Sequence, residues 1–90
     1  MRSARAGSLE SGDCLVTIEP SAPGTGVELV LESSVMYCYG IKIREVVEDA
    51  LRSAACDVHV SVIDRGAMDF VIRARIETAL SRARSGGDPR

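Results

Sequence analysis

The strict alternation of residues 58–63 constrains the fold more than any other stretch of the chain. Three valines point to one side of an extended segment there, and His59, Ser61 and Ile63 point to the other. This two-residue period is typical of a strand with one face against a core and one face toward water. This is the clearest strand of the chain, and we expect His59 on its exposed face.

Two further strands are predicted upstream, at residues 14–19 and 27–32. Both are rich in branched aliphatic residues, which favour extended structure. The segment between them holds two prolines and two glycines in seven residues and is too short for the crossover helix that a parallel pair needs. We therefore expect these two strands to form an antiparallel pair.

Two stretches have the three-and-four spacing of an amphipathic helix. The first runs for about twenty residues, and its apolar stripe consists of Val35, Tyr39, Ile43, Val46, Val47, Ala50, Leu51 and Ala54. The second runs from about residue 67 to 84, and its stripe consists of Met68, Ile72, Ile76, Ala79, Leu80 and Ala83. A short strand at 69–73 is the alternative there, but the length and composition of the run favour a helix.

These elements predict an α+β fold of order β-β-α-β-α, with a small antiparallel sheet and two helices packed on one face. Ninety residues suit one domain, which we expect to span 1–90 with flexible tails at 1–6 and 85–90. The net charge of −2 and the pI of about 5.3 argue against nucleic-acid binding, although four arginines lie between 73 and 84. We interpret those arginines as a solvated face or a contact for an acidic partner.

Cysteine and histidine are too few and too widely spaced to predict a metal site. Cys14, Cys38 and Cys56 form no Cys-x-x-Cys pair, and His59 is the only histidine. We interpret the cysteines as reduced, partly core-filling residues of a cytoplasmic protein, and Cys14 as strand packing rather than a reactive thiol. No signal peptide or membrane-spanning run is visible.

The loop Gly-Ser-Leu-Glu-Ser-Gly-Asp at residues 7–13 is the candidate functional segment. Gly12 follows the Ser11 hydroxyl and, without a Cβ, lets another protein's active site approach the backbone. Asp13 and Glu10 either position this loop, are recognised by a modifying enzyme, or only form hydrogen bonds within a turn. Ser8 is a competing hydroxyl that lacks the following Gly-Asp.

Self-contained catalysis is not predicted. Ser11 has no base evident in the sequence to activate it as a nucleophile, and neither a Gly-x-Ser-x-Gly elbow nor a phosphate-binding glycine loop occurs. A hydroxyl on a pliable loop suits a carrier, because a separate enzyme can modify it once and an attached group can then do the chemistry.

The 7–13 motif, followed by an apolar strand, resembles the acyl carrier protein (gamma) subunit of citrate lyase. The stretch 64–69 together with Arg73-Ala74-Arg75 resembles the C-terminal segment of the same family, and Ser33-Ser34-Val35 with Gly40 looks like the entry to its first helix. The resemblance spans roughly residues 7–84 in order and spacing. The chain differs from the helical-bundle carriers of fatty-acid synthesis, in which the modified serine begins a helix.

The resemblance implies that Ser11 bears 2'-(5''-phosphoribosyl)-3'-dephospho-coenzyme A through a phosphodiester, with Gly12 and Asp13 as motif neighbours. It implies a non-catalytic carrier of acetyl and citryl thioesters in a citrate-fermenting multienzyme complex. The implied partners are the alpha (transferase) and beta (lyase) subunits, a prosthetic-group transferase and an acetate-activating ligase, and any divalent metal belongs to the beta subunit. A recombinant sample can lack the group.

Three other readings stand beside this one. The carrier subunit of malonate decarboxylase has the same kind of group and a Ser-Gly-Asp motif, and citramalate lyase is nearly indistinguishable at this level. The third is a small α+β interaction module whose Ser11 is never modified.

Overall fold

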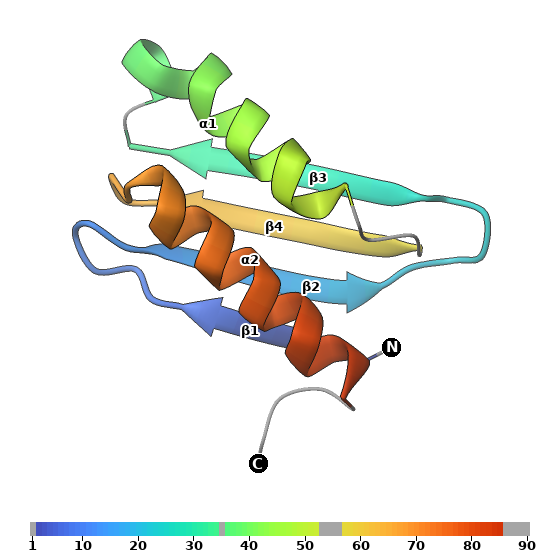
Figure 1. Ribbon diagram of the computed structural model, residues 1–90. Coiled ribbons are helices and arrows are strands. Elements are labelled where there is room, and N and C mark those ends of the chain that lie inside the picture. The colour runs from blue at the N-terminus through green and yellow to red at the C-terminus, as the bar shows by residue number, and fades with distance from the viewer. Residues whose placement is uncertain (1, 35, 53–56, 86–90) are drawn as a thin grey trace.

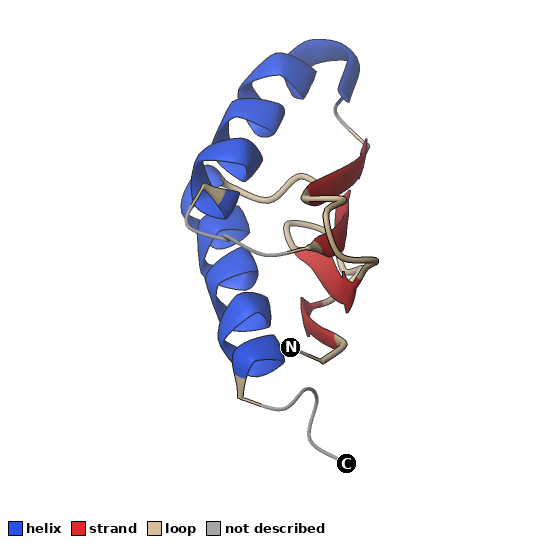
Figure 2. Ribbon diagram, turned by 90° about the vertical axis from the view of Figure 1, so that its right-hand side faces the viewer, coloured by secondary structure: helices blue, strands red, loops and turns tan. Residues whose placement is uncertain are grey.

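The computed structural model describes residues 2–34, 36–52 and 57–85 and shows one sheet with two helices lying across one of its faces (Figures 1 and 2). The elements are β1 (Ala4–Gly7), β2 (Cys14–Pro20), β3 (Val27–Ser33), α1 (Met36–Leu51), β4 (Val58–Asp64) and α2 (Asp69–Arg84). The α+β class with both helices on one face is confirmed, and the predicted order β-β-α-β-α runs from β2 to α2.

The strand order is β1-β2-β4-β3, so β4 lies at the centre of the sheet. It pairs antiparallel with β2 and parallel with β3. The prediction that the strands at 14–19 and 27–32 pair with each other is therefore wrong, and the sheet is mixed rather than wholly antiparallel. The chain can place β4 parallel to β3 because α1 supplies the long crossover between them.

The β2–β3 connection crosses the end of the sheet at which β4 begins. Pro20 and Val27 are both register partners of Val58, on its two sides. Two strand spacings are about 10 Å, and six residues can span about 20 Å, so residues 21–26 cover the gap without a helix. The Gly26 N–H donates to the Asp57 carboxylate at 2.8 Å, which fastens this connection to the segment before β4.

The N-terminal segment is a strand and not the flexible tail expected for residues 1–6. Ala4–Gly7 pairs antiparallel with β2, and the side chains of Ala4 and Ala6 are buried. Alanine adds little apolar signal to a sequence, but its small side chain lets α2 pack closely over this edge of the sheet. An N–H of the Arg82 guanidinium donates to the Arg5 carbonyl at 2.8 Å and links α2 to β1. Of the tail predicted at 85–90, Ser85 is the C-cap of α2, and residues 86–90 lie outside the described residues.

The core lies between the sheet and the two helical stripes. The inward residues of β4 and β2 pack against buried residues of both helical stripes. Those of α1 are Ile43, Val46, Val47 and Leu51. Those of α2 are Ile72, Ile76, Ala79, Leu80 and Ala83. The helix predicted over 67–84 is confirmed, and the alternative strand at 69–73 is wrong. Met68 precedes α2 and is exposed, while the predicted stripe residues Val35 and Ala54 lie outside the described residues.

Candidate functional site

The 8–13 loop joins β1 to β2 at the end of the sheet where β4 turns into α2 (Figure 1). The Gly12 N–H donates to the Arg65 carbonyl at 2.8 Å, and the Arg65 N–H donates to the Asp13 carbonyl at 2.9 Å. These two backbone bonds hold the loop against the 64–68 turn. The two sequence motifs, about fifty residues apart along the chain, therefore lie side by side in space.

Two glycines in this region have the positive φ that glycine tolerates best, 96° at Gly7 and 82° at Gly12. A Cβ at Gly7 would lie 1.8 Å from the Cys14 carbonyl oxygen, which accepts the Ser8 N–H at 3.2 Å. Position 7 therefore excludes any side chain. A Cβ at Gly12 would meet nothing within 4 Å, so the space beside Ser11 is open.

The structure separates the two hydroxyls of the loop. The Ser8 hydroxyl is part-buried, donates to the Asp13 carboxylate at 2.7 Å and accepts the Glu10 N–H at 3.3 Å. Ser11 is exposed at the tip of the loop, and its side chain makes no hydrogen bond within the described part of the chain. Of these two loop hydroxyls, that of Ser11 is thus the one that is both uncommitted and accessible.

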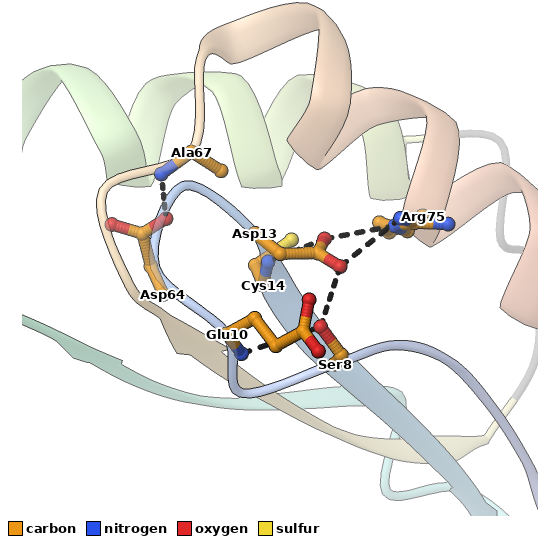
Figure 3. A network of polar contacts seen from close by, with 7 residues as sticks. All are labelled: Ser8, Glu10, Asp13, Cys14, Asp64, Ala67 and Arg75. Carbon is orange, nitrogen blue, oxygen red and sulfur yellow. Dashed lines mark hydrogen bonds and ion pairs between the residues drawn. The ribbon is translucent and has the colours of Figure 1, made fainter.

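Asp13 is the centre of the polar contacts that shape this loop (Figure 3). Its Oδ1 accepts Arg75 Nε–H at 3.0 Å and the Cys14 N–H at 2.7 Å, and its Oδ2 accepts Arg75 Nη2–H at 3.1 Å and the Ser8 hydroxyl at 2.7 Å. The hydrogen bonds from Arg75, and next that from Ser8, lower the pKa of Asp13 to about 2. The same pairing raises the pKa of Arg75. Asp13 is therefore ionised, and its carboxylate joins Ser8 and Cys14 of this segment to Arg75 of α2.

Sequence reasoning missed the role of Arg75, which it grouped with other arginines as a solvated face or an acidic-partner contact. The signal that could have found it is its place in the Arg73-Ala74-Arg75 stretch. Arg73, two residues earlier, instead pairs with Asp49 of α1. Two arginines of one helix thus contact different elements because a two-residue step rotates the side chain by more than half a turn.

Asp64 supports the turn that anchors the loop. Its carboxylate is buried and accepts the Ser33 hydroxyl at 2.7 Å, the Ala67 N–H at 2.9 Å and the Gly66 N–H at 3.2 Å. These bonds tie the end of β3 to the β4–α2 turn and fix the backbone of Arg65 between them. In the sequence this residue belonged to the 64–69 stretch that carries part of the family resemblance, and no role was assigned to its side chain.

Cys14 and His59 lie in β2 and β4, and neither side chain is presented at the loop. Cys14 is buried, and its desolvation, followed by the charges of Asp13 and Asp64, raises the pKa of its thiol to about 11. His59 is the second residue of β4, at the opposite end of that strand from Asp64, about 16 Å away at the rise of an extended chain. Its side chain lies on the face of the sheet away from the helices.

Among residues 2–34, 36–52 and 57–85, no group of three or more histidine, cysteine, aspartate or glutamate side chains is arranged to hold a metal ion. Within the same ranges, neither helix has the length and apolar character needed to cross a membrane.

Comparisons with known proteins agree on one family. The family model described as "Malonate decarboxylase delta subunit (MdcD)" matches residues 1–83. The citrate lyase acyl carrier protein of Rhodopseudomonas palustris is 45% identical over 84 residues, covering 92% of this chain and 84% of the relative. That of Vibrio cholerae is 48% identical over 79 residues, covering 87% and 80%, and that of Halothermothrix orenii is 34% identical over 88 residues, covering 97% and 92%.

A solved structure shares the fold. It is a crystal structure of a Pseudomonas malonate decarboxylase hetero-tetramer in complex with malonate, and one of its chains superposes with a TM-score of 0.74 at 24% identity, over 89% of this chain and 81% of that one. The family model and the curated relatives, which match most of the chain, carry the assignment. The chain belongs to the citrate lyase acyl carrier protein family.

Proposed function

We propose that the protein is the acyl carrier subunit of a citrate lyase and that Ser11 bears its prosthetic group through a phosphodiester. The observation that carries the proposal is the contrast between the two loop hydroxyls: Ser8 is held by Asp13, whereas Ser11 is exposed and uncommitted. Family membership supports the acyl carrier role. The exposure of Ser11 on the loop supports this residue as the attachment site.

The residues around Ser11 fit a bulky covalent group. Gly12 adds no side chain, and the space that a Cβ would occupy there is empty to 4 Å. The loop does not depend on the Ser11 hydroxyl for its shape, because its contacts run through Asp13, Ser8 and the backbone of Arg65. Replacing the hydroxyl proton by a phosphodiester therefore removes no contact that holds the loop.

The attachment is a phosphoryl transfer catalysed by a separate enzyme. Ser11 Oγ would hold the group as a phosphodiester: its O–H bond would be replaced by an O–P bond, and the bond from that phosphorus to the donor's leaving group would break, with the electron pair going to the leaving group. The hydroxyl proton would pass to a base of the transferase, because no candidate base among residues 2–34, 36–52 and 57–85 contacts the Ser11 hydroxyl. Gly12 and Asp13 serve as close-approach and loop-shaping neighbours.

When bound, the group supplies a thiol that holds acyl groups as thioesters. The protein tethers that thiol in the cytoplasm and presents it to the transferase and lyase subunits of the complex. Tethering raises the effective concentration of the thiol at each active site. The names of the curated relatives support citrate lyase. The family description and the shared fold of the Pseudomonas complex favour malonate decarboxylase as the second candidate.

Intact-mass measurement of the protein from its native host tests the attachment, and fragmentation of the adduct peptide locates it. We expect one adduct of the stated group on Ser11, none on Ser11→Ala, and a full adduct on Ser81→Ala, which removes an exposed hydroxyl of α2. An unmodified wild-type protein would favour the simple interaction module, and an adduct on Ser8 would contradict the assignment to Ser11. The subunits that co-purify decide between citrate, citramalate and malonate as the substrate.

A further inference from the structure

The 8–13 loop is short and exposed at its tip, but its two ends are held firmly. The Ser8 N–H donates to the Cys14 carbonyl, and the Asp13 N–H donates to the Glu10 carbonyl at 3.1 Å. Ser11 lies within the segment that each of these two hydrogen bonds closes. The direction in which its hydroxyl points therefore depends on what fixes the two ends.

A single side chain from another element joins both ends. The Arg75 guanidinium binds both oxygens of Asp13, and one of those oxygens also holds the Ser8 hydroxyl. A bidentate contact of this kind fixes the orientation of the carboxylate as well as its position. Without it, the Asp13 carboxylate keeps the Cys14 N–H and the Ser8 hydroxyl as partners, but the contact that fixes it relative to α2 is lost.

Arg75 can act in this way because α2 is rigidly placed. Ile72, Ile76 and Ala79 are buried against the sheet, which sets the rotation of the helix and directs Arg75 toward the loop. Gly7 leaves room for the arginine stem, since a Cβ at that position would lie 3.2 Å from Arg75 Cδ. The packed core thus fixes the position of Arg75, and the Arg75–Asp13 ion pair fixes the loop relative to α2.

We propose that Arg75 is a positioning residue for the modification of Ser11: through Asp13 it holds the 8–13 loop in the shape that the prosthetic-group transferase recognises. This inference rests on the proposed attachment at Ser11. Arg75 acts on the population of the competent loop shape and not on the phosphoryl group itself. The apparent affinity of the transferase for this protein falls in proportion to that population.

The test uses the purified full-length chain as substrate for a citrate lyase prosthetic-group transferase with its phosphoanhydride donor. Initial rates of adduct formation are followed by intact mass. For Arg75→Met we expect KM for the carrier to rise about tenfold with kcat nearly unchanged. Arg73→Met is the matched control, because Arg73 lies on the same helix and pairs with Asp49, away from the loop. We expect it to behave as wild type.

Three further variants separate positioning from general stability. Asp13→Asn should raise KM to the same extent, and Arg75→Met combined with Asp13→Asn should be no worse than either alone, because both changes break one contact. Arg75→Lys keeps the charge and most of the stem without the bidentate geometry, so it should give an intermediate KM and serves if Arg75→Met fails to fold. Rates are compared at a temperature where far-UV circular dichroism shows every variant folded.

An Arg75→Met KM equal to that of Arg73→Met overturns the inference while leaving the attachment at Ser11 intact. A fall in kcat at constant KM also overturns it, since that result would place Arg75 on the reacting phosphate. A wild-type protein that gains no adduct on Ser11 overturns the proposed function and this inference together.

Discussion

Ser33 and Asp64 end two neighbouring parallel strands, and the Ser33 hydroxyl donates to the Asp64 carboxylate at 2.7 Å. The same carboxylate accepts two backbone N–H groups of the turn that follows β4. A buried charge is tolerated because each oxygen is hydrogen-bonded. This residue therefore links the edge of the sheet to the turn that carries Arg65 and, through Arg65, to the candidate attachment loop.

Asp64→Ala should destabilise the fold by about 3 kcal/mol, because it removes a buried carboxylate that accepts the Ser33 hydroxyl and the N–H groups of Gly66 and Ala67. Urea unfolding followed by circular dichroism measures the free energy. Asp69→Ala is the control, since Asp69 is exposed and accepts only the neighbouring Phe70 N–H, and its cost should stay below about 1 kcal/mol. Equal losses for the two variants would contradict the role given to Asp64.

Gly7→Ala and Gly12→Ala should differ although both replace a glycine of positive φ. Gly12→Ala has open space around it and should cost about 1 kcal/mol of backbone strain. Gly7→Ala carries the same strain and also drives a methyl group into the Cys14 carbonyl, so its cost should reach about 3 kcal/mol or more. Denaturant unfolding of both variants compares them directly, and a Gly7→Ala protein as stable as Gly12→Ala would show that the turn relaxes at little cost.

The Asp13 carboxyl should titrate with a midpoint of about 2, below its ordinary value of 3.8. Because the folded-state pKa lies below the unfolded one, the stabilisation from this group is complete above pH 3.8 and is lost as the pH falls toward 2. Chemical shifts of the Asp13 side chain against pH give the midpoint. In Arg75→Met the midpoint should move upward, since Arg75 is the largest cause of the shift. A midpoint of about 3.8 in the wild-type protein would show that the ion pair does not form in solution.

The ion pair itself should add only about 1 kcal/mol to the stability of the fold, because about two fifths of the Arg75 side chain is exposed to water and the attraction is screened. Arg75→Met should therefore lower the free energy of unfolding by about that amount in urea at neutral pH. A loss above about 3 kcal/mol would indicate a structural role larger than loop positioning.

The Cys14 thiol should resist alkylation in the folded protein. Its pKa of about 11, against an ordinary 9.0, lowers the thiolate fraction at pH 8 by about a hundredfold, and burial blocks access as well. Peptide mapping after iodoacetamide treatment reports this position separately from the other cysteines. Labelling of Cys14 at the same rate before and after denaturation would show that the start of β2 opens readily.

Local sequence patterns predicted most elements of this fold. The alternation in β4 and the stripes of the two helices follow from side-chain burial along one segment, and such patterns are visible without knowing which segments are neighbours. The strand β1 escaped notice because its inward residues are alanines, whose apolar signal is small. The pairing of β2 with β4 also escaped notice, since a short connection can cross one end of a sheet as easily as it can close a hairpin.

By itself, the sequence determined the α+β class, the buried faces of the helices and β4, and the choice of Ser11 as the candidate hydroxyl within a small, glycine-flanked loop. Only the tertiary structure brought Asp13 to Arg75 and Gly12 to Arg65, and with these contacts it distinguished the held Ser8 hydroxyl from the free one at Ser11. The physical reason is range. Periodicity and turn chemistry act over a few residues, whereas the long-range contacts of this loop join groups 52 to 62 residues apart and exist only once the core has packed α2 and β4 beside it.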